Sequence, residues 1–408
     1  MRLLKPHLLA PLMLCGLFIL TTSFTRTWYQ KANHGGDARH RVVGFAIGNK
    51  GYIGGGHVNS GIEITYRDFW EYDPATNSWT QIADFAGGLR YHSSAFVIDG
   101  AAYVGCGENS TDEYTNDFWK YVPEVNSWFA VADMPGTPRR GGIAFSVNGL
   151  GYYGTGQSEE GYHTDLFEYD PASDTWTSIA DFPGEARNAS VSFVNESKAY
   201  VGTGHKVGEA LNDFYVYDPA TDSWDTLASV GGSIRQDAMG FCIDGKGYIG
   251  LGNDNIDTDF RDIWEYDFDL DTWTKVGDFA GQKRRYAVTF VIENNVYLCS
   301  GTDGTNMKDL WVWAPTVSIE EEQLHQLSIN AYPNPSNDWM RINLDGIDDL
   351  STVDLVLSIS NINGQTVYKK PIDQSQIILN KNEIGSGIYF AQITSSKGIV
   401  HQTKIAFK

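Results

Sequence analysis

A unit that recurs six times, at intervals of 48–51 residues, restricts the fold of this chain more than any other feature. Each copy contains a Tyr between small or apolar residues, followed by a glycine pair written Gly-x-Gly in most copies. The copies read GYIGGG (51–56), AYVGCG (102–107), GYYGTG (151–156), AYVGTG (199–204), GYIGLG (247–252) and VYLCSG (296–301). A period of this length indicates one supersecondary unit that buries its apolar face against its neighbours.

A second block follows in every unit and places a Tyr seven residues before a Trp, as in DFWEYDPATNSW (68–79). The sixth copy, DLWVWAPT (309–316), begins in the same way and lacks the Trp. Each unit contains four short runs rich in aromatic and β-branched residues, separated by Gly, Asn, Asp and Pro. This pattern predicts four antiparallel strands per unit, and radial repetition of such units predicts an all-β, six-bladed propeller.

The N-terminal segment completes the sixth unit. Residues 27–39 read TWYQKANHGGDAR and share the rhythm of SWTQIADFAGGLR at 78–90, with 11 residues from Trp to Arg in both. We therefore predict that residues 27–34 form the outermost strand beside residues 309–315, with Trp28 as the missing Trp. Such an exchange closes the ring and leaves no open strand edge at the seam.

The glycine pair followed by Tyr and Trp resembles the kelch repeat, over residues 27–315. The resemblance implies a kelch-type propeller that binds its ligand on a loop face. Six-bladed kelch propellers that interconvert the anomers of sialic acid are known, so a sugar mutarotase or epimerase is the alternative that the resemblance implies.

The termini predict export. Residues 1–23 contain two positive charges, an apolar run and a small-x-small site, which together are typical of a signal peptide. A membrane anchor is the alternative, although the apolar run is shorter than a bilayer span. Residues 24–315 are then the propeller, and 316–326, with three consecutive Glu, the linker.

Residues 327–408 predict a small β-sandwich, because apolar positions alternate between short turns. YPNP at 332–335, the Asn-Gly turn at 363–364, GIYF at 387–390 and a final strand with Lys resemble the C-terminal sorting domain of the type IX secretion system of Bacteroidota. The resemblance implies export through that machinery to the cell surface or medium. A carbohydrate-binding or adhesive sandwich is the alternative.

Two columns of charged residues repeat in every unit. An Arg lies six residues before a Phe of the first strand, and an Asp opens the third strand. The columns are Arg39, Arg90, Arg139, Arg187, Arg235 and Arg284, and Asp68, Asp117, Asp165, Asp213, Asp262 and Asp309. One interpretation is an ion pair between neighbouring blades. The other is a ring of guanidinium groups at the channel mouth, suited to carboxylates or acidic sugars.

A third column follows the glycine pairs and stays polar while its identity changes. It consists of His57, Glu108, Gln157, His205, Asn253 and Thr302. Loops on a rigid scaffold often carry binding residues, so these six are ligand-binding candidates, with solvated turns as the alternative. If the protein is an enzyme, Glu108 is the candidate acid/base and Arg90 the carboxylate anchor. We assign the Trp column to the core, with sugar stacking as the alternative.

The remaining features limit the classes of ligand. The net charge of −21 argues against nucleic acid and anionic membranes. Asp254, Asp257 and Asp259 are weak candidates for calcium, but their spacing fits no standard loop, and we expect no cofactor. The sequence predicts an exported monomer that recognises a glycan or a protein, with a mutarotase or a structural adhesin as alternatives.

Overall fold

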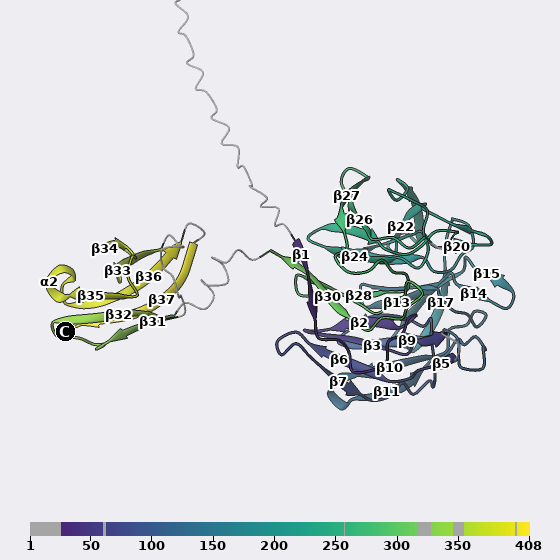
Figure 1. The fold of residues 1–408 in the computed structure, drawn as a ribbon, viewed down its shortest axis with the longest axis horizontal. Coiled ribbons are helices and arrows are strands. Elements are labelled where there is room, and N and C mark those ends of the chain that lie inside the picture. The colour runs from purple at the N-terminus through teal and green to yellow at the C-terminus, as the bar shows by residue number, and fades with distance from the viewer. Residues whose placement is uncertain (1–25, 60–62, 257, 317–327, 346–354, 396–397) are drawn as a thin grey trace, which may run out of the picture. The chain divides into compact units, whose positions relative to one another are not determined.

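A computed structural model describes residues 26–59, 63–256, 258–316, 328–345, 355–395 and 398–408. The predicted signal peptide and nearly all of the predicted linker lie outside these residues. The chain divides into two compact units, residues 1–315 and 316–408 (Figure 1). Within the described part of the chain, no helix has the length and apolar character to cross a bilayer.

The described residues of the first unit form six four-stranded antiparallel sheets. In the first three, the strands are β2 (Val43–Ile47), β3 (Lys50–Gly54), β6 (Phe69–Asp73), β7 (Ser78–Ile82); β8 (Ser94–Ile98), β9 (Ala101–Gly105), β10 (Phe118–Val122), β11 (Ser127–Val131); and β12 (Ile143–Val147), β13 (Leu150–Gly154), β16 (Leu166–Asp170), β17 (Thr175–Ile179). In the last three they are β18 (Val191–Asn195), β19 (Lys198–Gly202), β22 (Phe214–Asp218), β23 (Ser223–Leu227); β24 (Met239–Ile243), β25 (Lys246–Gly250), β26 (Asp262–Asp267), β27 (Thr272–Asp278); and β28 (Val288–Ile292), β29 (Asn295–Cys299), β30 (Leu310–Pro315), β1 (Arg26–Lys31).

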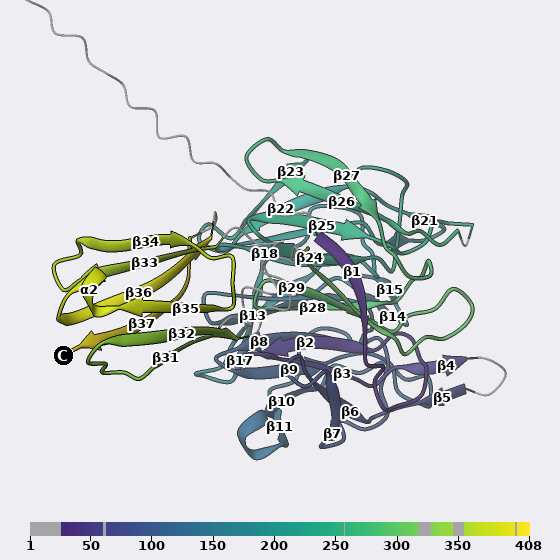
Figure 2. The same ribbon diagram turned by 60° about the vertical axis from the view of Figure 1, so that its left-hand side comes forward.

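The sheets are arranged in a closed ring. The first strand of each sheet contacts the first strand of the next, in the order β2, β8, β12, β18, β24 and β28, and β28 contacts β2. Three hairpins, β4 (His57–Asn59) with β5 (Glu63–Thr65), β14 (Gln157–Ser158) with β15 (Gly161–Tyr162), and β20 (His205–Lys206) with β21 (Glu209–Ala210), extend from loops after the second strands. They project on the same side of the ring (Figure 2). A short 3-10 helix, η1 (Pro123–Val125), connects β10 and β11.

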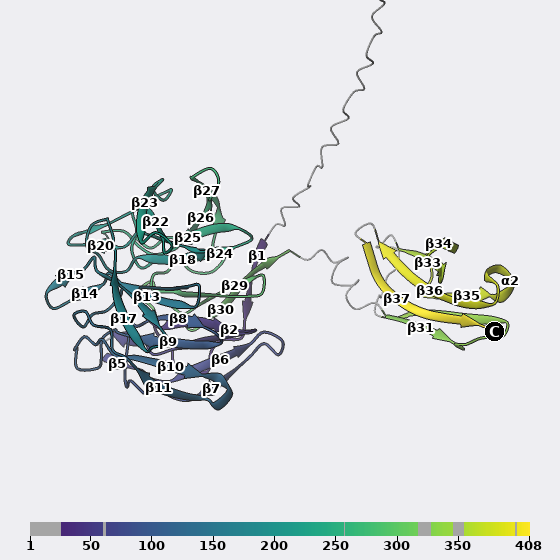
Figure 3. The ribbon, with the colours of Figure 1, turned by 180° about the vertical axis from the view of Figure 1, so that it is seen from behind.

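The N-terminal strand closes the sixth sheet as predicted. β1, at the edge of the ring in Figure 3, pairs antiparallel with β30. In this register Trp28 lies opposite Trp313. The Trp28 ring meets Phe279 edge-on at 4.8 Å, so it packs on the fifth-repeat side of the seam. The prediction of an N-terminal strand beside the last strand is confirmed, with the strand covering residues 26–31.

The Gly-x-Gly signature reflects close backbone approach. A Cβ on Gly105 would lie 2.4 Å from the ring of Phe118 and 2.4 Å from a backbone oxygen. Gly107 has φ +100°, and a Cβ there would lie 2.6 Å from the carbonyl oxygen of Tyr91. The close contacts leave no space for a Cβ at either position, and the positive φ of Gly107 disfavours a side chain there as well.

The Trp column belongs to the core between neighbouring sheets. Trp128, for example, donates its indole N–H to the carbonyl of Ala83 at 3.0 Å and meets Phe85 edge-on. The assignment of these residues to the core is therefore confirmed.

The second unit consists of two antiparallel sheets with one shared core. The three-stranded sheet contains β31 (Ser328–Tyr332), β32 (Trp339–Asp345) and β35 (Gln376–Asn380), and the four-stranded sheet contains β34 (Thr366–Pro371), β33 (Val356–Asn361), β36 (Gly387–Ser395) and β37 (Gly398–Phe407). A short helix, α2 (Lys381–Ile384), follows β35. Ile342 and Leu379 from one sheet pack in the same cluster as Leu357 and Ile393 from the other.

Candidate functional site

The six repeated Arg residues belong to the scaffold. Each is buried and forms an ion pair with the Asp at the start of the third strand of the same sheet: Arg39–Asp68, Arg90–Asp117, Arg139–Asp165, Arg187–Asp213, Arg235–Asp262 and Arg284–Asp309. The expectation of a pair between neighbouring blades is therefore wrong. Each Arg lies in the loop that leads into the first strand of its own sheet. From there its side chain reaches the Asp on the third strand of that sheet.

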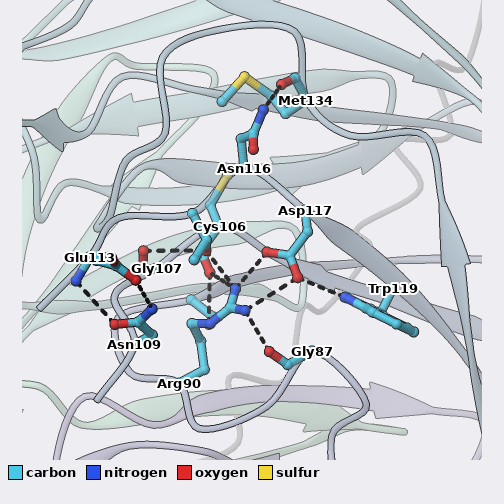
Figure 4. Close-up of polar contacts among 12 residues, drawn as sticks. Gly87, Arg90, Cys106, Gly107, Asn109, Glu113, Asn116, Asp117, Trp119 and Met134 are labelled. Carbon is cyan, nitrogen blue, oxygen red and sulfur yellow. Dashed lines mark hydrogen bonds and ion pairs between the residues drawn. The ribbon is translucent and has the colours of Figure 1, made fainter. Parts of the chain in front are cut away.

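Arg90 shows why this column is a poor ligand site (Figure 4). Its two terminal nitrogens bond to both carboxylate oxygens of Asp117, at 2.7 and 3.2 Å, and to the carbonyls of Gly87 and Cys106, at 2.7 and 3.0 Å. Trp119 donates to the same carboxylate. Because these donors already have partners, Arg90 has little capacity to anchor a substrate carboxylate.

The residues two positions after each Arg form a belt around the centre of the ring. The belt consists of Arg41, His92, Gly141, Ala189, Asp237 and Tyr286, and all six have φ between +53° and +62°. Five successive backbone N–H···O bonds of 2.9–3.2 Å link them in this order, each from one repeat to the repeat before it. Positive φ is costly for residues other than glycine, so the belt is held in place by these bonds.

The belt lines a central cavity of about 140 Å³. Arg41, His92, Asp237 and Tyr286 provide its larger polar side chains, whereas Gly141 and Ala189 leave space on the other side. The cavity is well above the roughly 10–15 Å³ that one water requires. The arrangement therefore provides a polar recess where the six repeats meet.

Burial determines the charge states in this recess. Burial raises the pKa of Asp237 to about 6, against the attraction of Arg41 and a bond to Tyr286. Burial also raises the pKa of Tyr286 to about 12 and lowers the pKa of His92 well below its ordinary value, with Arg41 adding to the effect on His92. At neutral pH the His92 ring is therefore uncharged, and Asp237 titrates near the physiological range.

Arg41 differs from the scaffold arginines in its partners. It donates to the hydroxyl of Tyr286 at 2.8 Å, and its other terminal nitrogen lies 3.1 Å from Nε2 of His57. Burial lowers the pKa of His57 to about 3 and that of its neighbour His40 to about 4, so neither ring adds charge at neutral pH. Within the described residues, no carboxylate lies at ion-pair distance from the Arg41 guanidinium. Nε of Arg41, Nδ1 of His92 and Nε of Arg140 are buried without a hydrogen-bond partner.

The variable polar column forms a layer next to the belt. The backbone of each member forms an isolated antiparallel β-bridge with the residue that follows a scaffold Arg. The pairs are His57 with His40, Glu108 with Tyr91, Gln157 with Arg140, His205 with Asn188, Asn253 with Gln236 and Thr302 with Arg285. His57, Glu108, Asn253 and Thr302 are buried, so the alternative of solvated turn residues is wrong for these four.

The side chains of this column mostly contact one another or nearby residues. Glu108 forms an ion pair with Arg140, and Gln157 accepts a bond from Asn188 at 3.1 Å. Glu108 therefore has a cationic partner within the fold, whereas Asp237 lines the cavity.

The predicted calcium candidates have other partners. Asp254 accepts the backbone N–H groups of Ile256 and Thr258, and Asp259 pairs with Arg285 at 2.9 Å. Asp257 lies outside the described residues. No group of three or more potential metal ligands occurs among the residues that the structure describes.

Sequence reasoning missed the belt, although its position is regular. The residues two positions after the repeated Arg are Arg, His, Gly, Ala, Asp and Tyr in chain order. No two of the six are of the same type. Only its fixed spacing from the Arg column marked it as a ring of equivalent positions.

Comparisons with known proteins agree with this architecture. The solved structure titled "Structure of YjhT", a β-propeller, is similar with a TM-score of 0.58 and 19% identity, over 70% of this chain and 95% of that chain. At this identity the likeness concerns the fold alone. A curated relative, ulvan lyase NLR42 of Nonlabens ulvanivorans, is 32% identical over 104 residues, which span 24% of this chain and 18% of the lyase.

The second unit is assigned by its sequence. Residues 330–408 match the family model described as the secretion system C-terminal sorting domain. This confirms the predicted sorting domain and its interaction with the type IX secretion machinery. The chain therefore carries a type IX sorting domain and is exported to the cell surface or the extracellular space.

Proposed function

We propose that this chain is an exported recognition protein whose central recess binds a carboxylated sugar, at the end of a glycan or free. The observation that supports this most directly is Arg41, a guanidinium beside a polar cavity with no carboxylate at ion-pair distance among the described residues. The ring is then a six-bladed kelch-type propeller over residues 24–315. Residues 1–23 are its signal peptide, 316–326 its linker and 327–408 a sorting domain of sandwich type.

Charge pairing favours an anionic ligand at this position. The six scaffold arginines and Arg140 and Arg285 all have carboxylate partners, so their charges are balanced within the fold. Arg41 instead has the neutral partners Tyr286 and His57. Asp237 attracts Arg41 from elsewhere in the recess without pairing with it. A ligand carboxylate would give Arg41 a directly bonded counter-charge, since guanidinium groups bind carboxylates with two parallel bonds.

Two of the buried polar atoms that lack a hydrogen-bond partner belong to the recess. Nε of Arg41 and Nδ1 of His92 belong to residues that line the cavity. Buried polar groups without partners are costly, so a ligand that bonds to them gains affinity from this relief. Hydroxyl and carboxylate groups of a sugar provide the acceptors and donors that these atoms need.

A second candidate function is a sugar mutarotase or epimerase. The observation that favours it is Asp237, whose pKa of about 6 suits a group that accepts and returns a proton near neutral pH. Asp237 and Arg41 then replace the pair Glu108 and Arg90 as the acid/base and the carboxylate anchor. A structural adhesin, the third alternative, would need none of these groups.

An NMR screen of the exported chain against neutral and carboxylated sugars tests both functions. We expect line broadening for a carboxylated sugar, loss of it in Arg41→Met, and retention in Arg67→Met, which removes an exposed guanidinium elsewhere. Anomer exchange that disappears in Asp237→Asn would favour the enzyme. Binding without anomer exchange would favour the recognition protein. No binding by any sugar of the panel would contradict the proposal.

A further inference from the structure

The three-stranded sheet of the sorting domain has an unusual outward face. Met340 and Ile342 on β32 and Leu379 on β35 point into the core, so the alternate residues point outward. An outward face of an antiparallel sheet is normally polar. Here Tyr332, Trp339 and Ile378 are 76%, 45% and 53% exposed.

The strand register places these residues next to one another. Tyr332 lies opposite Arg341, and Arg341 lies opposite Ile378, so the three form one row across β31, β32 and β35. Trp339 precedes Arg341 by two residues on the same face, and its ring lies 6.0 Å from the Arg341 guanidinium. We call Tyr332, Trp339, Arg341 and Ile378 the aromatic face.

The composition of the aromatic face is that of a protein-binding site. Single exposed apolar residues are common, but Tyr, Trp and Arg together are enriched where binding energy concentrates. Arg341 has no carboxylate partner among the described residues, which leaves its charge available to a partner. The four-stranded sheet presents Ile388 and Phe390 outward, and Phe390 lies opposite the polar residues Lys404 and Ser360.

The sorting domain also differs from the rest of the chain in its net charge. Residues 327–408 contain seven Lys or Arg and seven Asp or Glu, whereas the whole chain has a net charge of −21. A receptor that binds the sorting domain therefore meets a module without net charge, on which Arg341 pairs with no carboxylate of the described residues. Such a receptor needs an apolar groove for the rings and a carboxylate for the guanidinium.

We propose that the aromatic face is the surface on which a component of the type IX secretion machinery, with an apolar groove and a carboxylate, docks. The domain match selects this partner over the propeller or a second copy. A sorting domain must be recognised from its own surface, and its core residues are inaccessible. The proposal is independent of the ligand that the propeller binds.

Secretion of the full chain in a Bacteroidota host with a type IX system tests the proposal. The variant Trp339→Ser/Ile378→Ser removes two exposed side chains, and Arg341→Glu reverses the charge. The matched control, Ile388→Ser/Phe390→Ser, removes two apolar side chains that are 46% and 36% exposed on the other sheet. The ratio of exported to periplasmic chain is measured by immunoblot.

We expect at least about a tenfold fall in the exported fraction for both aromatic-face variants, because loss of one hot-spot contact weakens binding by that order. The control should change by less than about twofold on the same scale. Thermal unfolding of the purified chains should be unchanged, which separates lost docking from lost folding. Wild-type export of the aromatic-face variants, or an equal defect in the control, would overturn the proposal. The proposal would also be overturned if the wild type were a dimer and Arg341→Glu converted it to a monomer that is fully exported.

Discussion

Replacement of Asp262 by Asn tests whether the repeated Arg column is scaffold or ligand site. Arg235 is fully buried, and both of its terminal nitrogens bond to the Asp262 carboxylate at 2.9 Å. Burial tends to raise the pKa of Asp262, but the bonds from Arg235 and the attraction of its charge hold this pKa below its ordinary value. The variant keeps the shape of the side chain and removes its charge, which leaves Arg235 buried without a counter-charge.

The size of the effect follows from the burial of the pair. Removal of one partner of a buried ion pair costs about 3–5 kcal/mol. Because the Asp262 side chain retains 19% exposure and Asn still accepts one bond, we expect the lower end, about 3 kcal/mol. With a urea m-value of about 3 kcal/mol/M, the unfolding midpoint should fall by about 1 M. Trp fluorescence reports this transition, since 11 of the 12 Trp residues lie within residues 27–315.

Two further variants make the test specific. Asp269→Asn removes an exposed carboxylate from the turn after β26 and should change the free energy of unfolding by less than about 0.5 kcal/mol. Arg235→Met/Asp262→Asn removes both charges and should recover part of the loss. If Asp262→Asn unfolds like the wild type and instead abolishes sugar binding, the assignment of this column to the scaffold is wrong.

Three other variants separate the recess from the scaffold. Asp237 has a pKa of about 6 in the folded chain and of about 3.9 when unfolded. The folded state binds more protons between these values, so the free energy of unfolding falls by about 2–3 kcal/mol as pH rises through them. The free energies of unfolding at pH 4 and 7.5 should show this fall in the wild type and not in Asp237→Asn. Trp28→Ala removes a half-buried ring from the seam, and urea unfolding should show a loss of about 2–3 kcal/mol, less than for a fully buried Trp. Glu108→Gln leaves Arg140 without its carboxylate, and calorimetry should show tighter binding of a carboxylated sugar, whereas weaker binding would make Glu108 itself a ligand contact.

The sequence predicted the sheets and the seam because their signals are local and repeated. The Trp-to-Arg spacing identified β1 as the partner of β30. Because β1 pairs with β30, Trp28 lies at the seam. The same repetition identified the Arg and Asp columns as equivalent positions. It did not show which Asp each Arg reaches, because the loop of the Arg and the third strand come together only in the folded sheet.

The belt could not be predicted for a different physical reason. Its residues share a backbone conformation and a chain of backbone hydrogen bonds, and neither depends on residue type. Five of the six are not glycine, so the usual sequence signal for positive φ is absent. The raised pKa of Asp237 also depends on burial by residues from other repeats, which the linear sequence does not reveal.

One short loop therefore carries two tasks in each repeat. Its Arg bonds to the Asp of the same sheet and fixes the loop, and the residue two positions later faces the centre. Arg235 and Asp237 show this division, since the first is tied to Asp262 and the second lines the recess. Because the backbone bonds of the belt do not involve side chains, the residues in the recess are free to differ between repeats without loss of the ring. Substitutions at Arg41 or Asp237 should consequently change binding, in addition to the pH-dependent effect of Asp237 on stability, whereas substitutions in the Arg column should change stability.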